Sequence, residues 1–153
     1  MKKPYPVMLN LAHKSVAVIG GGQVAARKIK GLLSVQADVT VISPAISPQI
    51  DVRRVHWLAH GYQRADVDQM ALIIACTDDP VVNQQVVDEA DSLQWVNNTS
   101  DQTQSDFFNV AIVRENGIMV SVSTNGKSPT LAKKIKKQLQ GWLQQNFGNH
   151  ERS

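Results

Sequence analysis

Short apolar runs alternate with helix-like stretches along the first two thirds of the chain. Residues 16–19 and 70–76 are almost wholly apolar, which is typical of strands that are buried on both faces of a parallel sheet. Residues 24–33 instead place their apolar side chains on one face of a helix, with basic side chains, Lys28 among them, on the other. This alternation predicts an α/β protein.

The same patterns predict the remaining elements of a Rossmann-like parallel sheet within residues 1–112. Ten polar residues in a row, 97–106, predict a loop that follows a strand and therefore lies on the ligand-binding face of the sheet. Further strands are predicted at 37–42, 52–58 and 95–96, and a further helix at 81–90.

The alternation ends in the last third of the chain, which we predict to be a separate region, residues 113–153. Two β-rich runs flank Asn116-Gly117, and this dipeptide in such a position predicts a tight hairpin. Ser128 and Pro129 are suited to begin a C-terminal helix, whose polar face is rich in lysine. Exposed hairpins of this kind commonly pair with a second subunit, although an ordinary sheet edge is the alternative.

Composition narrows the class of protein. The chain has 153 residues, of which 42% are hydrophobic and 19% charged, as expected for a globular protein with a real core. The net charge of +3 is too mild to indicate nucleic-acid binding. No apolar run approaches the ~20 residues that span a membrane, and no signal peptide is evident. The single cysteine, Cys76, cannot form an internal disulfide, so we expect a cytoplasmic protein.

Three glycines follow the first strand and begin the first helix. Gly20-x-Gly22-x-x-Ala25 fits the fingerprint of a dinucleotide-binding loop. The first glycine permits a sharp turn, the second lets phosphates approach the backbone, and the small third residue allows helix and strand to pack closely. A glycine turn that only joins the strand to the helix is the alternative.

Two other strand ends add to this candidate site. The second strand ends in Ser43-Pro44-Ala45 without the acidic residue that often holds the ribose hydroxyls of NAD. This position therefore does not distinguish NAD from NADP, although the lack of an arginine disfavours NADP. Thr77 and Asp78 follow the strand at 70–76, so we expect them in the same crevice as the glycines; helix capping is the alternative role. No set of metal ligands is predicted.

Several of these segments occur together, in an order and spacing that cover most of the chain. In this arrangement they resemble the NAD-dependent precorrin-2 dehydrogenases, which occur alone or as the N-terminal part of sirohaem synthase. The segments are Val18-Ile19-Gly20-Gly21-Gly22-Gln23-Val24-Ala25-Ala26-Arg27-Lys28, Ala75-Cys76-Thr77-Asp78-Asp79, Val96-Asn97 and Val120-Ser121-Val122-Ser123-Thr124-Asn125-Gly126-Lys127-Ser128-Pro129.

The resemblance implies an NAD-binding Rossmann-like sheet, a hairpin that builds a homodimer, and oxidation of precorrin-2 to sirohydrochlorin with hydride passing to NAD. Some members also insert ferrous iron, and the resemblance leaves this ferrochelatase activity open. The substrate is an octacarboxylate, which the lysine-rich helix and Lys127 would attract. The residues predicted to bind the cofactor are Gly20, Gly22, Gln23, Val24, Ser43, Pro44, Ala45, Thr77 and Asp78. The residues predicted to bind the substrate are Thr124, Asn125, Lys127 and Ser128.

The sequence departs from the family at the residue proposed as its general acid/base. The family usually has an aspartate where this chain has Ser100, and the next residue is Asp101. A carboxylate can accept the proton that is lost as hydride leaves, whereas a serine at its ordinary pKa cannot. We therefore predict Asp101 as the catalytic base, with Ser100 beside it. A non-catalytic dimer that senses NAD is the alternative function.

Overall fold

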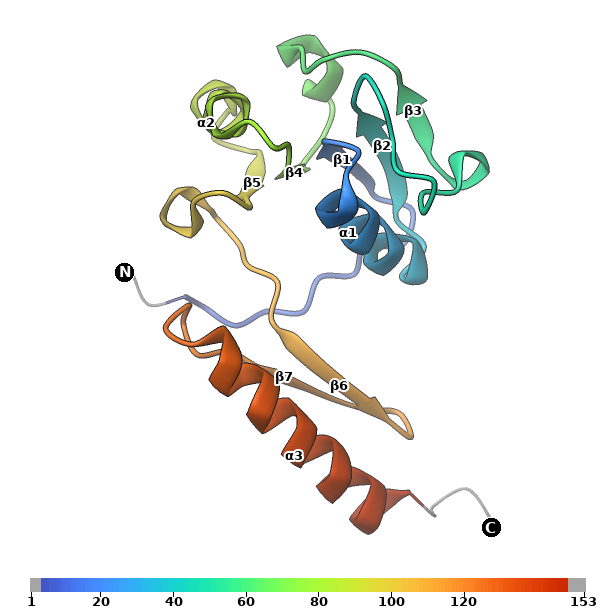
Figure 1. The fold of residues 1–153 in the computed structure, drawn as a ribbon, viewed down its shortest axis with the longest axis vertical. Helices are drawn as coiled ribbons and strands as arrows, with labels where there is room; N and C mark the ends of the chain where they lie inside the picture. The colour runs from blue at the N-terminus through green and yellow to red at the C-terminus, as the bar shows by residue number, and fades with distance from the viewer. Residues whose placement is uncertain (1–3, 149–153) are drawn as a thin grey trace. The chain divides into compact units, whose positions relative to one another are not determined.

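The computed structural model describes residues 4–148, and its main feature is a five-stranded parallel sheet with the strand order β3-β2-β1-β4-β5. The chain leaves the central strand β1 toward β2 on one side and later returns to β4 on the other side (Figure 1). This reversal creates the crevice in which sheets of this kind bind nucleotides. The strands are β1 (Ser15–Ile19), β2 (Asp38–Ile42), β3 (His56–Leu58), β4 (Leu72–Ala75) and β5 (Trp95–Asn98).

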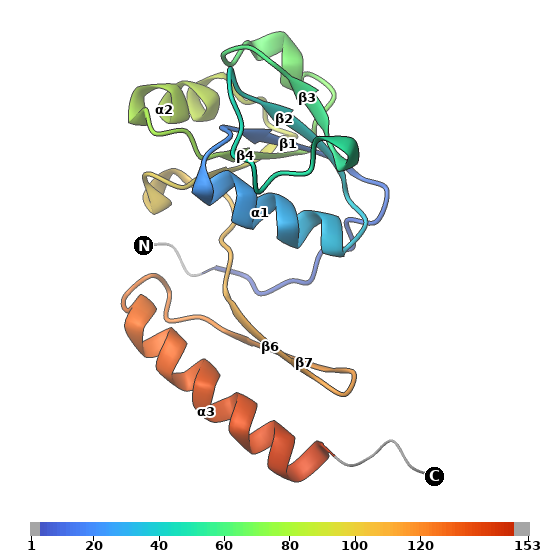
Figure 2. The same cartoon turned by 45° about the vertical axis from the view of Figure 1, so that its right-hand side comes forward.

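Alternate residues of the central strands feed two separate apolar layers, because successive side chains of a strand point to opposite faces. Val16 and Val18 pack with helix α1 (Gln23–Ser34) on one face. Ala17 and Ile19 pack on the other face with Val86 of helix α2 (Pro80–Glu89). Figure 2 shows the sheet between these two helices. The strands are therefore buried on both faces, as their unbroken apolar runs predict.

The hairpin and the last helix form a second compact unit. Strands β6 (Ala111–Glu115) and β7 (Ile118–Val122) pair antiparallel, and Asn116 and Gly117 take positive φ values of 46° and 76° at the turn. Helix α3 (Pro129–Phe147) packs against both strands. The Oγ of Ser128 accepts a hydrogen bond from the N–H of Leu131 at 3.1 Å, so the predicted cap is confirmed.

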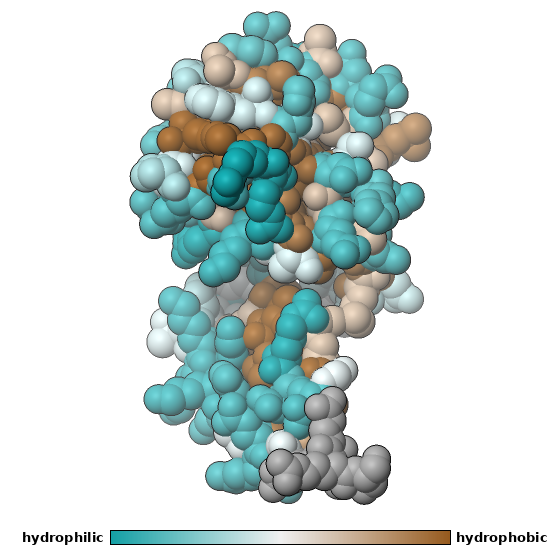
Figure 3. Space-filling view, turned by 90° about the vertical axis from the view of Figure 1, so that its right-hand side faces the viewer, coloured by the Kyte–Doolittle hydropathy of each residue, from teal (hydrophilic) through white to brown (hydrophobic). Residues whose placement is uncertain are grey.

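Two compact units divide the described chain, one of residues 7–108 and one of residues 4–6 with 109–148. The division into 1–112 and 113–153 stays a prediction about domains, and its parts at 1–3 and 149–153 lie outside the described residues. The face of the molecule in Figure 3 is mostly hydrophilic, with hydrophobic areas showing between the hydrophilic side chains.

The prediction of a strand over 52–58 is correct only for its end. Val52–Arg54 is a short 3₁₀ helix (η1), and only His56–Leu58 is a strand. The cause is local: the Asp51 carboxylate accepts hydrogen bonds from both the backbone and the side chain of Arg53, which turns the chain before it can join the sheet. Two further 3₁₀ helices are η2 (Arg64–Val67) and η3 (Gln102–Gln104).

The prediction of a loop over 97–106 is wrong for its first two residues. Asn97 and Asn98 belong to β5 and are buried. Their amides are satisfied inside the protein: Asn97 Nδ2 donates to the carbonyl of Phe107 at 2.9 Å, and Asn98 Oδ1 accepts from the N–H of Ser100 at 2.9 Å. Polar side chains can be buried when their hydrogen bonds are made in this way.

Candidate active site at the carboxyl ends of the strands

Gly20 makes the turn after β1 and brings the glycine loop against the end of β4. Its φ is 118°, a conformation that side-chain-bearing residues rarely adopt. A Cβ at this position would lie 2.7 Å from the carbonyl oxygen of Cys76 and 3.0 Å from the nitrogen of Thr77. The absence of a side chain thus lets the loops after β1 and β4 lie side by side, where the crevice is expected.

Gly21, which the fingerprint does not single out, brings in the loop after β2. A Cβ on Gly21 would overlap the carbonyl oxygen of Ala45. The carbonyl of Gly21 also accepts a hydrogen bond from the N–H of Ser47 at 2.7 Å. The run of three glycines rather than two was the available signal for this contact.

Gly22 is the N-cap of α1, and it leaves the start of the helix open. A Cβ built there would meet no heavy atom within 4 Å, and the residue is exposed. Because glycine has no side chain, none caps the first N–H groups of the helix, among them those of Gln23 and Val24. An open helix N-terminus of this kind suits the pyrophosphate of a dinucleotide, both by hydrogen bonding and by the helix dipole.

The end of β2 has its own internal hydrogen bonds. The Ser43 hydroxyl donates to the carbonyl of Ala45 at 2.7 Å, and the Ser43 carbonyl accepts from Nε1 of Trp57 at 2.9 Å. Ser43 is buried and therefore shapes the bend, whereas Pro44 and Ala45 are exposed beside the glycine loop. That Ser43, Pro44 and Ala45 bind the cofactor stays a prediction.

A buried amide, Asn83, connects the ends of β4 and β5. Its Oδ1 accepts from the N–H of Thr77 at 3.0 Å, and its Nδ2 donates to the Oγ of Ser100 at 2.6 Å. Sequence reasoning missed this residue. The signal was available, because Asn83 stands three residues before Val86 on the face of α2 that packs on the sheet.

Ser100 and Asp101 are neighbours in the chain, but their side chains have different partners. Ser100 accepts the bond from Asn83, whereas the Asp101 carboxylate accepts the N–H and the Oγ1 hydroxyl of Thr103 at 2.8 and 2.7 Å. These two bonds lower the pKa of Asp101 below its ordinary value. Asp101 is thus ionised at neutral pH and caps η3, and its lowered pKa weakens it as a base.

Lys28 is a basic residue of α1 that forms a hydrogen bond to β5. The sequence predicts it on the solvent face of α1, but it is half-buried, and its Nζ donates to Oδ1 of Asn97 at 3.4 Å. Burial lowers the pKa of Lys28 and raises the pKa of the Cys76 thiol to about 12. Cys76 is accordingly a neutral core residue, as its apolar run predicts.

The residues predicted to bind substrate lie in the second unit. Thr124 and Ser128 close a tight turn, since the Thr124 hydroxyl donates to the carbonyl of Ser128 at 3.1 Å and accepts from its N–H at 3.2 Å. Asn125 has a positive φ of 51°, and Asn125 and Lys127 are exposed. That these four residues bind substrate stays a prediction. Asp78 is exposed after β4, and its role is likewise a prediction.

Residues 4–148 include no candidate metal site and no candidate membrane-spanning helix. No group of three or more His, Cys, Asp or Glu side chains in this part of the chain could hold a metal ion. No helix within it is both long and apolar enough to cross a membrane.

Comparison with known proteins agrees with this geometry. Residues 7–111 match the family described as putative NAD(P)-binding, and residues 118–141 match the central region of a sirohaem biosynthesis protein. The fold and the glycine loop thus define an NAD(P)-binding protein of the Rossmann class. The chain belongs to the precorrin-2 dehydrogenase family. The sirohaem synthases contain a region that is similar to this chain.

Individual relatives support this assignment. The chain is 34% identical over 134 residues to the precorrin-2 dehydrogenase of Bacillus subtilis (strain 168), covering 85% of this chain and 83% of that one. It is 32% identical over 148 residues to sirohaem synthase 1 of Serratia proteamaculans (strain 568), covering 94% of this chain and 31% of that relative. The chain thus spans about a third of the length of the sirohaem synthases it matches.

A solved structure is also similar. The structure of SirC, a precorrin-2 dehydrogenase, superposes with a TM-score of 0.82 at 32% identity, covering 90% of this chain and 70% of that one. The predicted fold class, a Rossmann-like parallel sheet followed by a hairpin and a C-terminal helix, is confirmed.

Proposed function

We propose that this protein oxidises precorrin-2 to sirohydrochlorin and transfers the hydride to NAD. The observation that carries the proposal is the 34% identity to the Bacillus subtilis precorrin-2 dehydrogenase over 83% of that protein. The open N-terminus of α1 supports it, because a dinucleotide needs an uncapped set of N–H groups at this position.

The cofactor residues have separate roles in this proposal. Gly22, Gln23 and Val24 hold the pyrophosphate through their backbone N–H groups, and Gly20 gives the loop its turn. Pro44 and Ala45 border the adenosine, and the hydrogen bond from the Ser43 hydroxyl to the carbonyl of Ala45 fixes the bend that presents them. Thr77 and Asp78 border the nicotinamide, which supplies the hydride acceptor when it is bound. NAD is proposed over NADP because residues 43–45 include no arginine for a 2′-phosphate.

Asp101 is the proposed acceptor of the proton that precorrin-2 loses. Support comes from its ionised carboxylate at the strand-end edge, one residue from the position that is an aspartate in the family. The lowered pKa makes Asp101 a weaker base than an ordinary aspartate, so we propose proton transfer along with hydride departure rather than ahead of it.

The second unit is proposed to contact the substrate and a second copy of the chain. Thr124, Asn125, Lys127 and Ser128 form a turn at the start of α3, and a cationic side chain there suits an octacarboxylate. Exposed apolar side chains of this unit support a homodimer; they are Ile112, Leu131 and Trp142. Light scattering of the purified chain tests it, and a monomer at micromolar concentration would contradict it. Iron insertion is not part of the proposal.

The decisive experiment is anaerobic incubation of the purified protein with precorrin-2 and NAD. We expect sirohydrochlorin absorbance to rise together with NADH, in equal amounts, and to rise far more slowly with NADP. The Gly22→Asp variant is the control for cofactor dependence. A protein that binds NAD but forms no NADH would contradict the proposal and favour an NAD-sensing dimer instead.

A further inference from the structure

The carboxamide of Asn83 is fully buried. Its oxygen and nitrogen lie within hydrogen-bonding distance of four polar atoms. Its Oδ1 lies 3.0 Å from the N–H nitrogen and 2.8 Å from the Oγ1 of Thr77. Its Nδ2 lies 3.0 Å from the carbonyl oxygen of Thr77 and 2.6 Å from the Oγ of Ser100. A carboxamide has two donor hydrogens, and Asn83 uses both of them, one on the carbonyl of Thr77 and one on the Oγ of Ser100.

The backbone of Thr77 determines which way this amide faces. A backbone N–H can only donate and a backbone carbonyl can only accept, so Oδ1 must face the first and Nδ2 the second. The exchange of oxygen and nitrogen that often leaves an amide ambiguous would break both bonds at once. Nδ2 is therefore the atom that faces Ser100, and the serine oxygen has to accept.

Ser100 is thereby left with a hydroxyl proton that points away from Asn83. Its backbone N–H donates to Oδ1 of Asn98 at 2.9 Å, which holds the residue from the β5 side. Within residues 4–148 no acceptor receives the hydroxyl proton, and the residue is exposed at the strand-end edge. A hydroxyl held in this way can donate its proton to an acceptor atom of a ligand, and a neutral hydroxyl is too weak a base to take a proton from that ligand.

We infer that Asn83 is a positioning residue that holds the Ser100 hydroxyl as a hydrogen-bond donor to an acceptor atom of the tetrapyrrole. The identity of that ligand rests on the proposed function. Where the family usually has a carboxylate that would accept a proton, this chain has a hydroxyl that gives a hydrogen bond. Binding of the tetrapyrrole and removal of its proton are then divided between Ser100 and Asp101.

A double-mutant cycle tests whether Asn83 acts through Ser100. Asn83→Ala and Ser100→Ala should each lower kcat/KM for precorrin-2 about tenfold, and the double variant should be no worse than about tenfold, because both remove one interaction. Gln94→Ala, which removes another buried amide, is the matched control: alone it should leave kcat/KM for precorrin-2 at the wild-type value, and combined with Ser100→Ala it should add no further loss. If Asn83→Ala and Ser100→Ala instead multiply, to about 100-fold, the inference is overturned.

A pH profile distinguishes positioning from a merely structural role. The Ser100→Asp variant places a carboxylate where the Asn83 N–H can donate to it, and such a bond lowers the carboxylate pKa. When Asp101→Asn is added to that variant, the carboxylate at position 100 is the base that remains. Removing Asn83 should then move the acid limb of kcat/KM to higher pH by about one unit. An acid limb that does not move would contradict the inference, whatever the change in protein stability.

Anaerobic titration with sirohydrochlorin gives a readout that needs no turnover. Ser100→Ala and Asn83→Ala should each weaken its binding about tenfold, again without multiplying. If the wild type binds sirohydrochlorin but does not oxidise precorrin-2, the proposed function fails and this binding cycle still decides the inference. A wild type that neither turns over precorrin-2 nor binds sirohydrochlorin would overturn both.

Discussion

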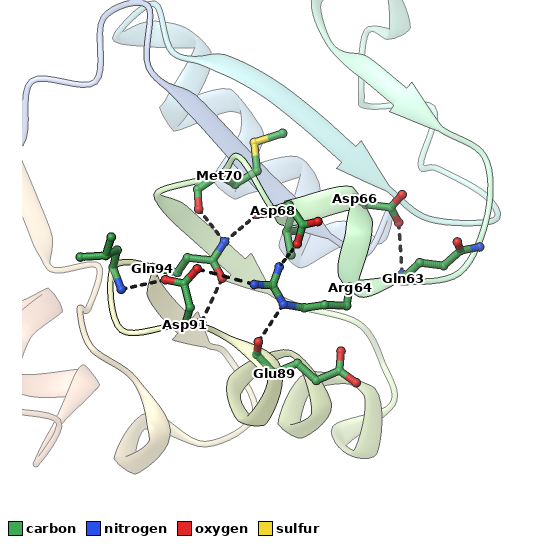
Figure 4. Close-up of polar contacts among 10 residues, drawn as sticks. Gln63, Arg64, Asp66, Asp68, Met70, Glu89, Asp91 and Gln94 are labelled. Atoms are coloured by element: carbon green, nitrogen blue, oxygen red, sulfur yellow. Dashed lines mark hydrogen bonds and ion pairs between the residues drawn. The ribbon is translucent and has the colours of Figure 1, made fainter.

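Two buried carboxamides lie at opposite ends of the strands β4 and β5, and they are used differently. Gln94, just before β5, donates through Nε2 to the carbonyls of Val67 and Met70 at 2.6 and 2.9 Å (Figure 4). Its Oε1 accepts from the N–H of Asp91 at 3.2 Å. All its partners are backbone groups, so it only joins segments of chain. Asn83, at the carboxyl end, has the hydroxyls of Thr77 and Ser100 among its partners, and we infer that it orients the Ser100 hydroxyl toward a ligand.

The surroundings of the two amides strengthen the contrast. At the amino end, Arg64 donates to the carbonyl of Glu89 at 2.8 Å and so caps the C-terminus of α2 (Figure 4). It also donates to the carboxylate of Asp68 at 2.7 Å. Nearby, the pKa of Tyr62 is raised to about 12, mainly by burial and to a lesser extent by the Glu89 carboxylate. At this end the side chains of Arg64 and Gln94 bond to groups of the protein itself, whereas the carboxyl end has an open helix N-terminus at Gly22. The difference predicts that substitutions at the amino end lower the stability of the protein, whereas substitutions at the carboxyl end weaken ligand binding.

The largest effect is expected from a charge in the glycine loop. Gly22→Asp should weaken NAD binding about 100-fold or more, because its carboxylate would repel the pyrophosphate. A factor of ten in affinity corresponds to ~1.4 kcal/mol. Isothermal titration measures the loss. Gly31→Asp is the matched control, because Gly31 lies in the same helix and its Cβ position is equally open. An equal loss of NAD binding in both variants would argue against the pyrophosphate site.

Next comes the proposed base. Asp101→Asn should lower kcat about 100-fold, which is the low end of the range for general acid–base catalysis, and leave NAD binding unchanged. Asparagine can still cap η3, so folding is preserved. Asp79→Asn is the control, because Asp79 caps α2 by accepting the N–H of Val81 at 2.8 Å and has no proposed role in the reaction. Wild-type turnover by Asp101→Asn would remove Asp101 from the mechanism.

At the amino end, Gln94→Leu should lower the free energy of unfolding by about 2 kcal/mol, because two carbonyls lose their donor in a buried site. Urea denaturation followed by circular dichroism measures it. NAD affinity should stay at the wild-type value, and a selective loss of NAD affinity without destabilisation would break the division between the two ends.

Arg64→Ala should have a smaller effect of about 1 kcal/mol on unfolding, because α2 loses a partly exposed C-terminal partner. The control is Arg53→Ala, whose ion pair with Asp51 is exposed and should contribute nothing measurable. Equal melting temperatures for Arg64→Ala and the wild type would show that the Arg64 contacts drawn in Figure 4 do not stabilise the fold.

A further effect concerns pH. The thiol pKa of Cys76 is raised from 9.0 to about 12, so above pH 9 the unfolded chain releases a proton that the folded chain keeps. The contribution of the neutral Cys76 thiol to the free energy of unfolding is fully present below pH 9 and is lost as the pH rises toward 12. Between pH 8 and pH 10, the stability advantage of the wild type over Cys76→Ala should shrink by about 1 kcal/mol. Denaturation at both pH values measures it, and an unchanged advantage would mean that the thiol is not buried.

Local signals predicted the elements that depend on neighbouring residues. Asn116-Gly117 takes the positive φ values of its turn, and Ser128 caps α3, because both depend on a few consecutive residues. The strand at 52–55 was wrong because Asp51 bonds to Arg53 instead. Lys28 and Asn97 were misplaced because their burial depends on each other and on segments that lie far apart in the sequence.

Short stretches of sequence are enough to predict most of the strands, the hairpin turn, the cap of α3 and the three glycines that precede a helix. The assembled sheet is needed to show that Gly21 admits the loop after β2 and that Asn83 faces Ser100. It is also needed to show that Asp101 caps its own loop. The physical reason is that a hydrogen bond depends on the direction of both partners, and strands β1, β2, β4 and β5 set those directions only after they have assembled into one sheet.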